Sequence, residues 1–298
     1  MFGGVRKSVA VLLRSVAVAW VATNPALAQD FFDIPAINLP SSITLEGGGD
    51  AAGARNLTVN ADVGLQSGTR IRAGIAGARV DASDVHYAGN TSWAGVNSDP
   101  LAPFSYGANY EAMQRDDGIR SAALKANVRW HFNDWQVTAY PELRSITLTK
   151  TQVTRKNLVR TVETTLGSPG LGAAVTYSGV EAWSFAFRRF VYRYDTDAQT
   201  LRSHPAFAQL VTSQVDQSFD AARSGVNADY APSWGSIGVE ATRSESAIDH
   251  AAARSVAVNL SWDATRAWTA FAHVGRSHAT GVAATGFASA GVTWMWDQ

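Results

Sequence analysis

Three polar residues near the C-terminus, Ser255, His273 and Ser289, are of the types that perform nucleophilic chemistry. A serine becomes a nucleophile when a histidine lies within hydrogen-bonding reach and a third group orients that histidine. If residues 263–265 form a turn between two strands, antiparallel pairing sets Ser255 opposite His273, and the next hairpin brings His273 level with Ser289 or Ala290. No Asp, Asn or Glu lies beside His273 in this register, so an orienting partner and an oxyanion stabiliser are missing. The spacing therefore favours polar residues on one strand face, with a lipid-active hydrolase as an alternative hypothesis.

No other set of residues has the spacing of a catalytic or cofactor site. The six histidines are scattered without metal-ligand spacing. The chain also lacks a glycine-rich phosphate loop, a Gly-x-Ser-x-Gly elbow and a His-Glu-x-x-His helix. We therefore predict no catalytic residue, no metal and no cofactor, and we expect that the protein is not an enzyme.

The elements that position these side chains are predicted to be strands, because apolar and polar residues alternate along much of the chain. Over residues 57–65, apolar side chains at odd positions alternate with Thr, Asn, Asp and Gly at even positions. The same pattern enters and leaves residues 133–134, 232–233 and 263–265. Runs of period two joined by short polar turns are typical of hairpins.

These strands predict an all-β fold, a transmembrane antiparallel up-and-down barrel. After the N-terminal stretch, no window reaches the roughly 18 consecutive apolar residues of a membrane helix, and alternating strands can cross a membrane only as a closed barrel. A first strand near residues 41–46, the final strand and the strands joined by five short turns make about twelve strands; these turns are 67–69, 133–134, 168–170, 232–233 and 263–265. Fourteen strands is the alternative, because residues 171–231 hold either two very long strands or four with an extra hairpin near residues 178–182.

The lengths of the connections predict the topology. Outer-membrane barrels keep their periplasmic turns short and their outer loops long. We therefore expect the five short turns at the periplasmic end. Residues 80–118, rich in Gly, Ser, Asn, Asp and Pro, are the predicted long outer loop, folded into the mouth of the barrel.

The tryptophans gather where strands meet one end of the predicted barrel. Seven tryptophans lie beside a predicted turn or at the extreme C-terminus: Trp130, Trp135, Trp234, Trp262, Trp268, Trp294 and Trp296. An amphipathic indole prefers a membrane interface, and barrels carry aromatic girdles there. The placement predicts such a girdle at one rim.

The last strand carries the most specific signal. In residues 286–296, Gly, Ala, Ala, Val, Trp and Trp alternate on one face, and Asp297 and Gln298 follow the terminal aromatic residue. This segment resembles the C-terminal strand of bacterial outer-membrane β-barrel proteins, which the barrel-insertion machinery reads. The resemblance covers the architecture of residues 41–298 and no narrower family. It implies outer-membrane lipid and the insertion machinery as partners.

The N-terminus predicts export. Arg6, Lys7 and Arg14 precede a short apolar run, and the sequence then ends in a small-x-small motif at Ala28. We expect residues 1–28 to be a signal peptide cleaved after Ala28, residues 29–40 to be a short periplasmic segment, and the cell outer membrane to be the destination. Removing the signal peptide leaves 22 basic and 25 acidic residues, a net charge of −3, which excludes the basic excess of a nucleic-acid binder.

Charges of both signs lie on the predicted lumen face. The turn at residues 133–134 places Lys125 opposite Glu142. The predicted pore-lining residues are Asp62, Arg70, Arg72, Lys125, Arg129, Glu142, Asn227, Asp229 and Glu240. Such residues line a water-filled path in a wide barrel and brace the interior of a narrow one. We therefore predict a passive pore for small hydrophilic solutes or for polymer export with envelope partners. A structural or adhesive barrel is the other alternative.

Overall fold

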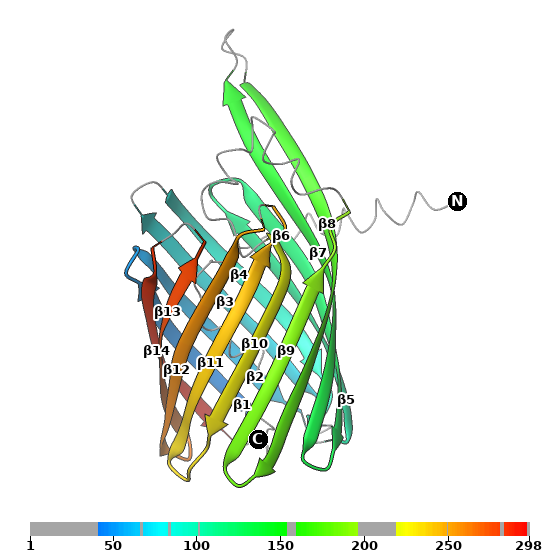
Figure 1. Ribbon diagram of the computed structural model, residues 1–298, viewed down its shortest axis with the longest axis vertical. Helices are drawn as coiled ribbons and strands as arrows, with labels where there is room; N and C mark the ends of the chain where they lie inside the picture. Colours follow the sequence, from blue (N-terminus) through cyan, green and yellow to red (C-terminus); the bar gives the residue numbers. More distant parts are fainter. Residues whose placement is uncertain are drawn as a thin grey trace, which may run out of the picture.

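The computed structural model shows a single closed β-barrel (Figure 1). It describes residues 41–65, 68–82, 85–100, 102–153, 159–195, 219–248, 250–280 and 283–296. The predicted signal peptide, its cleavage site and the segment 29–40 lie outside the described residues. Within the described residues there is no helix long and apolar enough to cross a membrane.

Fourteen antiparallel strands form the wall. They are β1 (Ser41–Asp50), β2 (Ala54–Gly64), β3 (Arg70–Ala82), β4 (Val85–Asn97), β5 (Phe104–Arg115), β6 (Ile119–Phe132), β7 (Trp135–Val153), β8 (Val159–Val180), β9 (Trp183–Tyr192), β10 (Asp220–Tyr230), β11 (Gly235–Ser246), β12 (Ala252–Thr265), β13 (Trp268–Ala279) and β14 (Thr285–Trp296).

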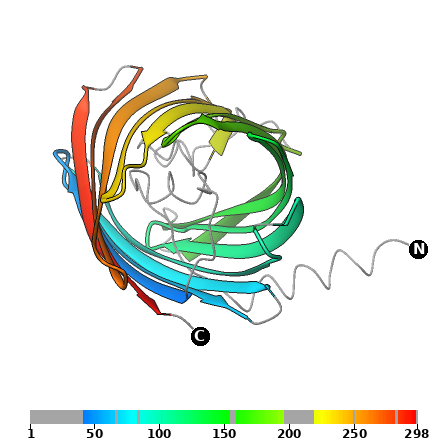
Figure 2. The same ribbon diagram turned by 90° about the horizontal axis from the view of Figure 1, so that it is seen from below.

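Each strand pairs with its neighbours in the sequence, and the first pairs with the last. The closing pair runs from Ser41 opposite Trp296 to Asp50 opposite Phe287. This pairing leaves no open sheet edge, so the predicted all-β, up-and-down antiparallel barrel is confirmed. Figure 2, which looks along the barrel, shows the ring of strands around the lumen.

The two ends of the barrel differ. We call the end that holds Ser41 and Trp296 the terminal end, and the opposite end the loop end. Connections at the terminal end are short, as at Asn133–Asp134 and Glu181–Ala182. At the loop end, residues 193–219 separate β9 from β10, and the β7–β8 hairpin projects beyond the other strands (Figure 1).

The strand count is fourteen, the predicted alternative to twelve, and the prediction that residues 80–118 form a long loop is wrong. This stretch contains the end of β3, all of β4 and all of β5. Gly, Asn and Ser in β4 are small or polar residues, which are typical of loops in a soluble protein. Here they fit a strand because β4 is hydrogen-bonded to β3 on one side and to β5 on the other.

The predicted turn at residues 168–170 is also wrong, because Ser168, Pro169 and Gly170 lie inside β8. Pro169 is tolerated there because the paired residues of β8 and β9 begin with Gly170 opposite Tyr192, so Pro169 lies outside this ladder. The Pro169 carbonyl accepts a hydrogen bond of 2.9 Å from the amide of Arg193, beyond that ladder, so the missing N–H of proline breaks no strand pair. The chain turns instead at residues 181–182, in the region of the predicted extra hairpin.

The wall is apolar outside and polar inside. The exposed large apolar side chains follow the outward positions of successive strands, as Val256, Val258 and Leu260 do on β12. Buried polar residues such as Thr58, Asp62 and Glu142 occupy inward positions. This is the reverse of a soluble domain and the expected arrangement for strands surrounded by lipid.

Candidate functional site: the barrel lumen

The nine predicted pore-lining residues all occupy inward positions on the wall. Asp62, Arg70, Arg129, Glu142 and Glu240 are buried, with exposed fractions of 4–8%. The other four are partly buried: Arg72, Lys125, Asn227 and Asp229. Eight of them fall into three separate groups on different strands, and Arg129 on β6 stands opposite Thr138 on β7.

The first group lies near the terminal end, on β2 and β3. The Arg70 side chain approaches Asp62 Oδ1 at 2.6 Å, and Arg72 Nε donates to Asp62 Oδ2 at 2.8 Å. Asp62 stands directly opposite Arg72 in the strand pairing. Two guanidinium groups therefore share one buried carboxylate.

The second group lies on β5, β6 and β7. Lys125 stands opposite Glu142, as predicted, but its ammonium group donates to Glu111 Oε2 at 2.6 Å. Glu142 instead accepts hydrogen bonds from Arg144 Nε at 2.9 Å and from the Tyr192 hydroxyl at 3.2 Å. Sequence alternation could have found Glu111 and Arg144, since both share the inward parity of their strands.

The third group spans three strands. Arg188 on β9 and Glu240 on β11 form a buried ion pair across β10. Gly225 makes this reach possible, because a Cβ atom there would lie 2.6 Å from Arg188 Nε. On β10 itself, Asn227 donates to Asp229. Arg188 was missed because the sequence did not resolve the strands between residues 171 and 231.

A different sector, on β12, β13 and β14, presents uncharged polar groups. The predicted pairing of Ser255 with His273 is wrong, because β12 continues to Thr265 and the chain turns at residues 266–267. Ser255 stands opposite Ser277, and Asn259 stands opposite His273. His273 in turn stands opposite Ser289, as one of the two predicted alternatives stated.

This Asn259–His273–Ser289 row is not an assembled nucleophile. His273 and Ser289 are 6% and 5% exposed. Within the described part of the chain, neither His273 Nε2 nor Ser289 Oγ has a hydrogen-bond partner, so the two are not joined as a serine–histidine pair. Their side chains face the lumen rather than the lipid.

Aromatic rings lie over glycines on the same sector. Phe271 stands opposite Gly291 and Phe287 opposite Gly275. A Cβ atom on either glycine would lie within 2.4 Å of the facing phenylalanine ring. Glycine therefore lets each ring lie flat along the wall, where a side chain would push it into the lumen.

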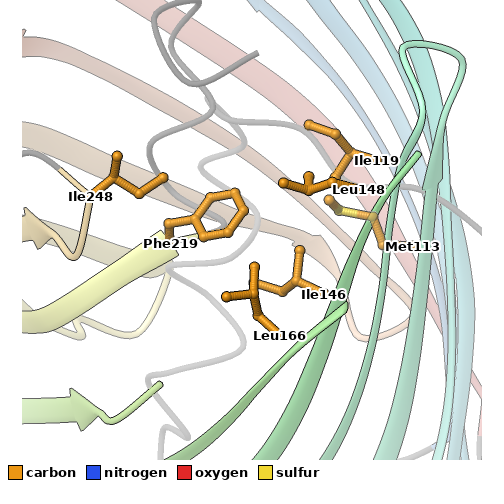
Figure 3. Close-up of a cluster of buried hydrophobic side chains, with 7 residues drawn as sticks. All are labelled: Met113, Ile119, Ile146, Leu148, Leu166, Phe219 and Ile248. Carbon is orange, nitrogen blue, oxygen red and sulfur yellow. The ribbon is translucent and has the colours of Figure 1, made fainter. Parts of the chain in front are cut away.

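An apolar cluster lies at the loop end of the lumen. Its seven buried members are Met113, Ile119, Ile146, Leu148, Leu166, Phe219 and Ile248. Figure 3 shows Phe219 between Ile248 on one side and the side chains of β5–β8 on the other. The cluster joins side chains of β5–β8 to Phe219 and Ile248, so apolar residues from several strands meet at this end of the lumen.

The predicted girdle tryptophans lie together at the terminal end. Six of them are exposed by 42–58%: Trp130, Trp135, Trp234, Trp262, Trp268 and Trp294. Trp296 is half-buried, and its ring centroid lies 5.0 Å from that of Trp294. Trp183, which sequence analysis did not include, has the same position on β9 and is 41% exposed.

Comparison with known proteins shows similarity of structure. No family model and no curated protein matches the sequence. The CymD monoaromatic hydrocarbon channel is similar with a TM-score of 0.56 at 8% identity, covering 95% of each chain. A loop L8 deletion mutant of OmpT, an outer membrane protein of Vibrio cholerae, gives a TM-score of 0.49 at 10% identity, covering 87% of this chain and 98% of the other. For the KdgM porin the TM-score is 0.42 at 10% identity, with coverages of 86% and 99%. The chain has the fold of the outer-membrane β-barrels.

Proposed function

We propose that this protein is a passive channel of a bacterial outer membrane that admits small hydrophilic solutes. The observation that carries the proposal is the closed wall with apolar side chains outside and ionisable side chains inside. Lipid accounts for the outside. The polar inner face is what a water-filled path requires.

The charges of the wall predict weak ion selectivity. Asp62, Glu111 and Glu142 each contact a basic partner within 2.8 Å. Opposite charges at such distances cancel much of each other's field at the length scale of a hydrated ion. We therefore propose that size and constriction, more than charge sign, decide which solutes pass.

The apolar cluster is the proposed constriction. Its residues lie at the loop end and come from both sides of the lumen (Figure 3). An apolar ring repels water and raises the barrier to ion entry. We therefore expect small conductance steps rather than those of a wide open pore.

Export belongs to the same proposal. Residues 1–28 are proposed to direct the chain across the inner membrane and to be removed after Ala28, and the C-terminal strand is proposed to engage the insertion machinery. N-terminal sequencing of protein from outer membranes should give Gln29 as the first residue. Recovery of chains that keep Met1 there would contradict it.

Single-channel recording in a planar bilayer tests the channel itself. The purified barrel should give stable ion-conducting steps, with a reversal potential near zero in a salt gradient. The matched control is the same protein unfolded by heat, which should insert nothing. A folded barrel that is electrically silent would reject the channel and favour a structural role through surface loops.

A further inference from the structure

The apolar outer face of the barrel is bordered by different kinds of residue at its two rims. On β12 the outward positions from the terminal end are Trp262, Leu260, Val258 and Val256, all at least 45% exposed. The next outward residue is Arg254, which is also exposed. The apolar face of this strand therefore ends in a positive charge at the loop end.

The two flanking strands repeat this order. On β11, Val239 and Ala241 are followed by Arg243. On β13, Val274 is followed by Arg276 and then by His278. The side chains of Arg243, Arg276 and His278 are exposed. The first outward positions beyond the apolar band thus hold basic residues on three adjacent strands.

Strand pairing brings these residues into one row. Arg243 stands directly opposite Arg254, and Arg254 stands directly opposite His278. Arg276 lies opposite Val256, one outward position closer to the middle of the apolar band. We call Arg243, Arg254 and Arg276 the basic row.

Like charges directly opposite each other on neighbouring strands are unfavourable. No side chain in the described residues forms an ion pair with an arginine of the basic row. The carboxylate on this face, Glu245, instead contacts His250 Nδ1 at 3.4 Å. Within the described part of the chain, the row therefore presents positive charge without an ion-pair partner.

A second pair of opposed arginines on the same rim has a carboxylate partner within the protein. Arg55 on β2 stands opposite Arg79 on β3. There Asp81 contacts Arg79 Nε at 2.5 Å and compensates the charge within the protein. Among the described residues no carboxylate contacts the basic row as Asp81 contacts Arg79, which leaves these arginines open to an anionic partner.

The height of the basic row matches the lipid headgroups. Trp262 and Arg254 are eight positions apart along β12, a rise of about 20 Å for strands of usual spacing and tilt. The apolar band of such barrels is roughly 25 Å tall, and an arginine side chain can extend toward the interface. If the tryptophans mark one interface, the guanidinium groups reach the other.

We propose that the basic row binds a phosphate group of an anionic lipid in the outer leaflet. Guanidinium groups bind phosphate oxygens through paired, charge-assisted hydrogen bonds. One phosphate between Arg243 and Arg254 would remove their mutual repulsion, and Arg276 would contact the same headgroup from the lipid side. The site rests on the proposed placement in an outer membrane but not on conduction.

Native mass spectrometry of the detergent-solubilised barrel tests this site with diphosphoryl lipid A as the probe. R243Q/R254Q should weaken lipid binding by about tenfold or more, since each lost charged hydrogen bond is worth about 1.5 kcal/mol or more. R55Q/R79Q is the matched control at the same rim and should change binding by less than about twofold. Heat-resistant migration in gels should show that both variants fold.

The probes distinguish a lipid from a free anion. Lipid A without phosphate should bind the wild type no more tightly than diphosphoryl lipid A binds R243Q/R254Q. Inorganic phosphate should not compete with the lipid when the two are present at equal concentrations. Equal binding of the two double variants, or equal binding of phosphate and lipid, would overturn the proposal. Conductance recorded on the same preparations keeps a failure of this site distinct from a failure of the channel.

Discussion

In two regions of the β7–β8 hairpin, side chains alternate between inward and outward positions in the same way. The apolar side chains point outward in one region and inward in the other. In the wall, Val137 and Leu143 point outward while Glu142 and Arg144 point inward. Beyond Arg144 the polarity reverses: Ile146 and Leu148 are buried inward. Thr147 faces outward and shares a hydrogen bond of 3.0 Å with Thr165.

The backbone is continuous through this reversal, so strand geometry does not cause it. What changes is the surrounding medium. Lipid favours apolar side chains outside the lower part, whereas water surrounds the projecting part and drives its apolar side chains toward the mouth. The residue at which the polarity reverses therefore marks where the hairpin leaves the membrane.

The sharpest test of this comparison introduces the same charge on both outward faces. Val258→Arg, in the middle of the apolar band, should lower the free energy of unfolding by about 2–4 kcal/mol. Thr165→Arg, on the projecting hairpin, loses only the exposed hydrogen bond with Thr147 and should change it by less than about 1 kcal/mol. Urea unfolding in lipid vesicles measures both. Equal losses would mean that the two outward faces meet the same medium.

A carboxylate buried in the wall should also differ from an exposed one on the projecting hairpin. Glu240→Gln removes the carboxylate that compensates Arg188, so we expect a loss of about 1–3 kcal/mol in the free energy of unfolding. The loss of this negative charge should shift the reversal potential toward anion selectivity. Glu163→Gln, on the exposed outward face of β8, is the matched control and should alter neither quantity.

Sequence analysis predicted the features that follow from alternation. The barrel, the inward charges and the Lys125–Glu142 pairing all follow from period-two runs around the two-residue turn at 133–134. The rest depended on contacts between distant segments. Ser-Pro-Gly at 168–170 has the composition of a turn, yet it remains extended because β7 pairs with it over its whole length.

Small errors in turn position changed the candidate site most. The turn lies at residues 266–267 rather than 263–265, which places Asn259 instead of Ser255 opposite His273. Strand β4 was missed for another reason. Trp93 lies over Gly74 across the pair, and neither residue alone indicates a strand. Such a complementary fit is visible only when the two strands are side by side.

The apolar cluster provides a test of the projecting region. Phe219→Ala removes the ring that lies between the walls of the mouth (Figure 3), so conductance should rise by about twofold or more as the apolar barrier widens. Amide exchange in β12–β14 should stay unchanged, because the wall does not depend on this cluster. Unchanged conductance with normal folding would place the constriction elsewhere.

The smallest expected effect lies where the apolar band meets water at the terminal end. Trp296→Ala removes the aromatic contact with Trp294, worth about 0.5–1.5 kcal/mol. It also removes the last outward aromatic side chain of β14, the strand that closes the barrel against β1. We therefore expect a modest loss of stability together with slower insertion, measured as the fraction of heat-resistant barrel formed over time in vesicles. Trp296→Phe should restore most of both, because a ring remains at the interface. If Trp296→Ala inserts as fast as the wild type, the terminal aromatic residue has no part in assembly, and the rim would be held by strand pairing alone.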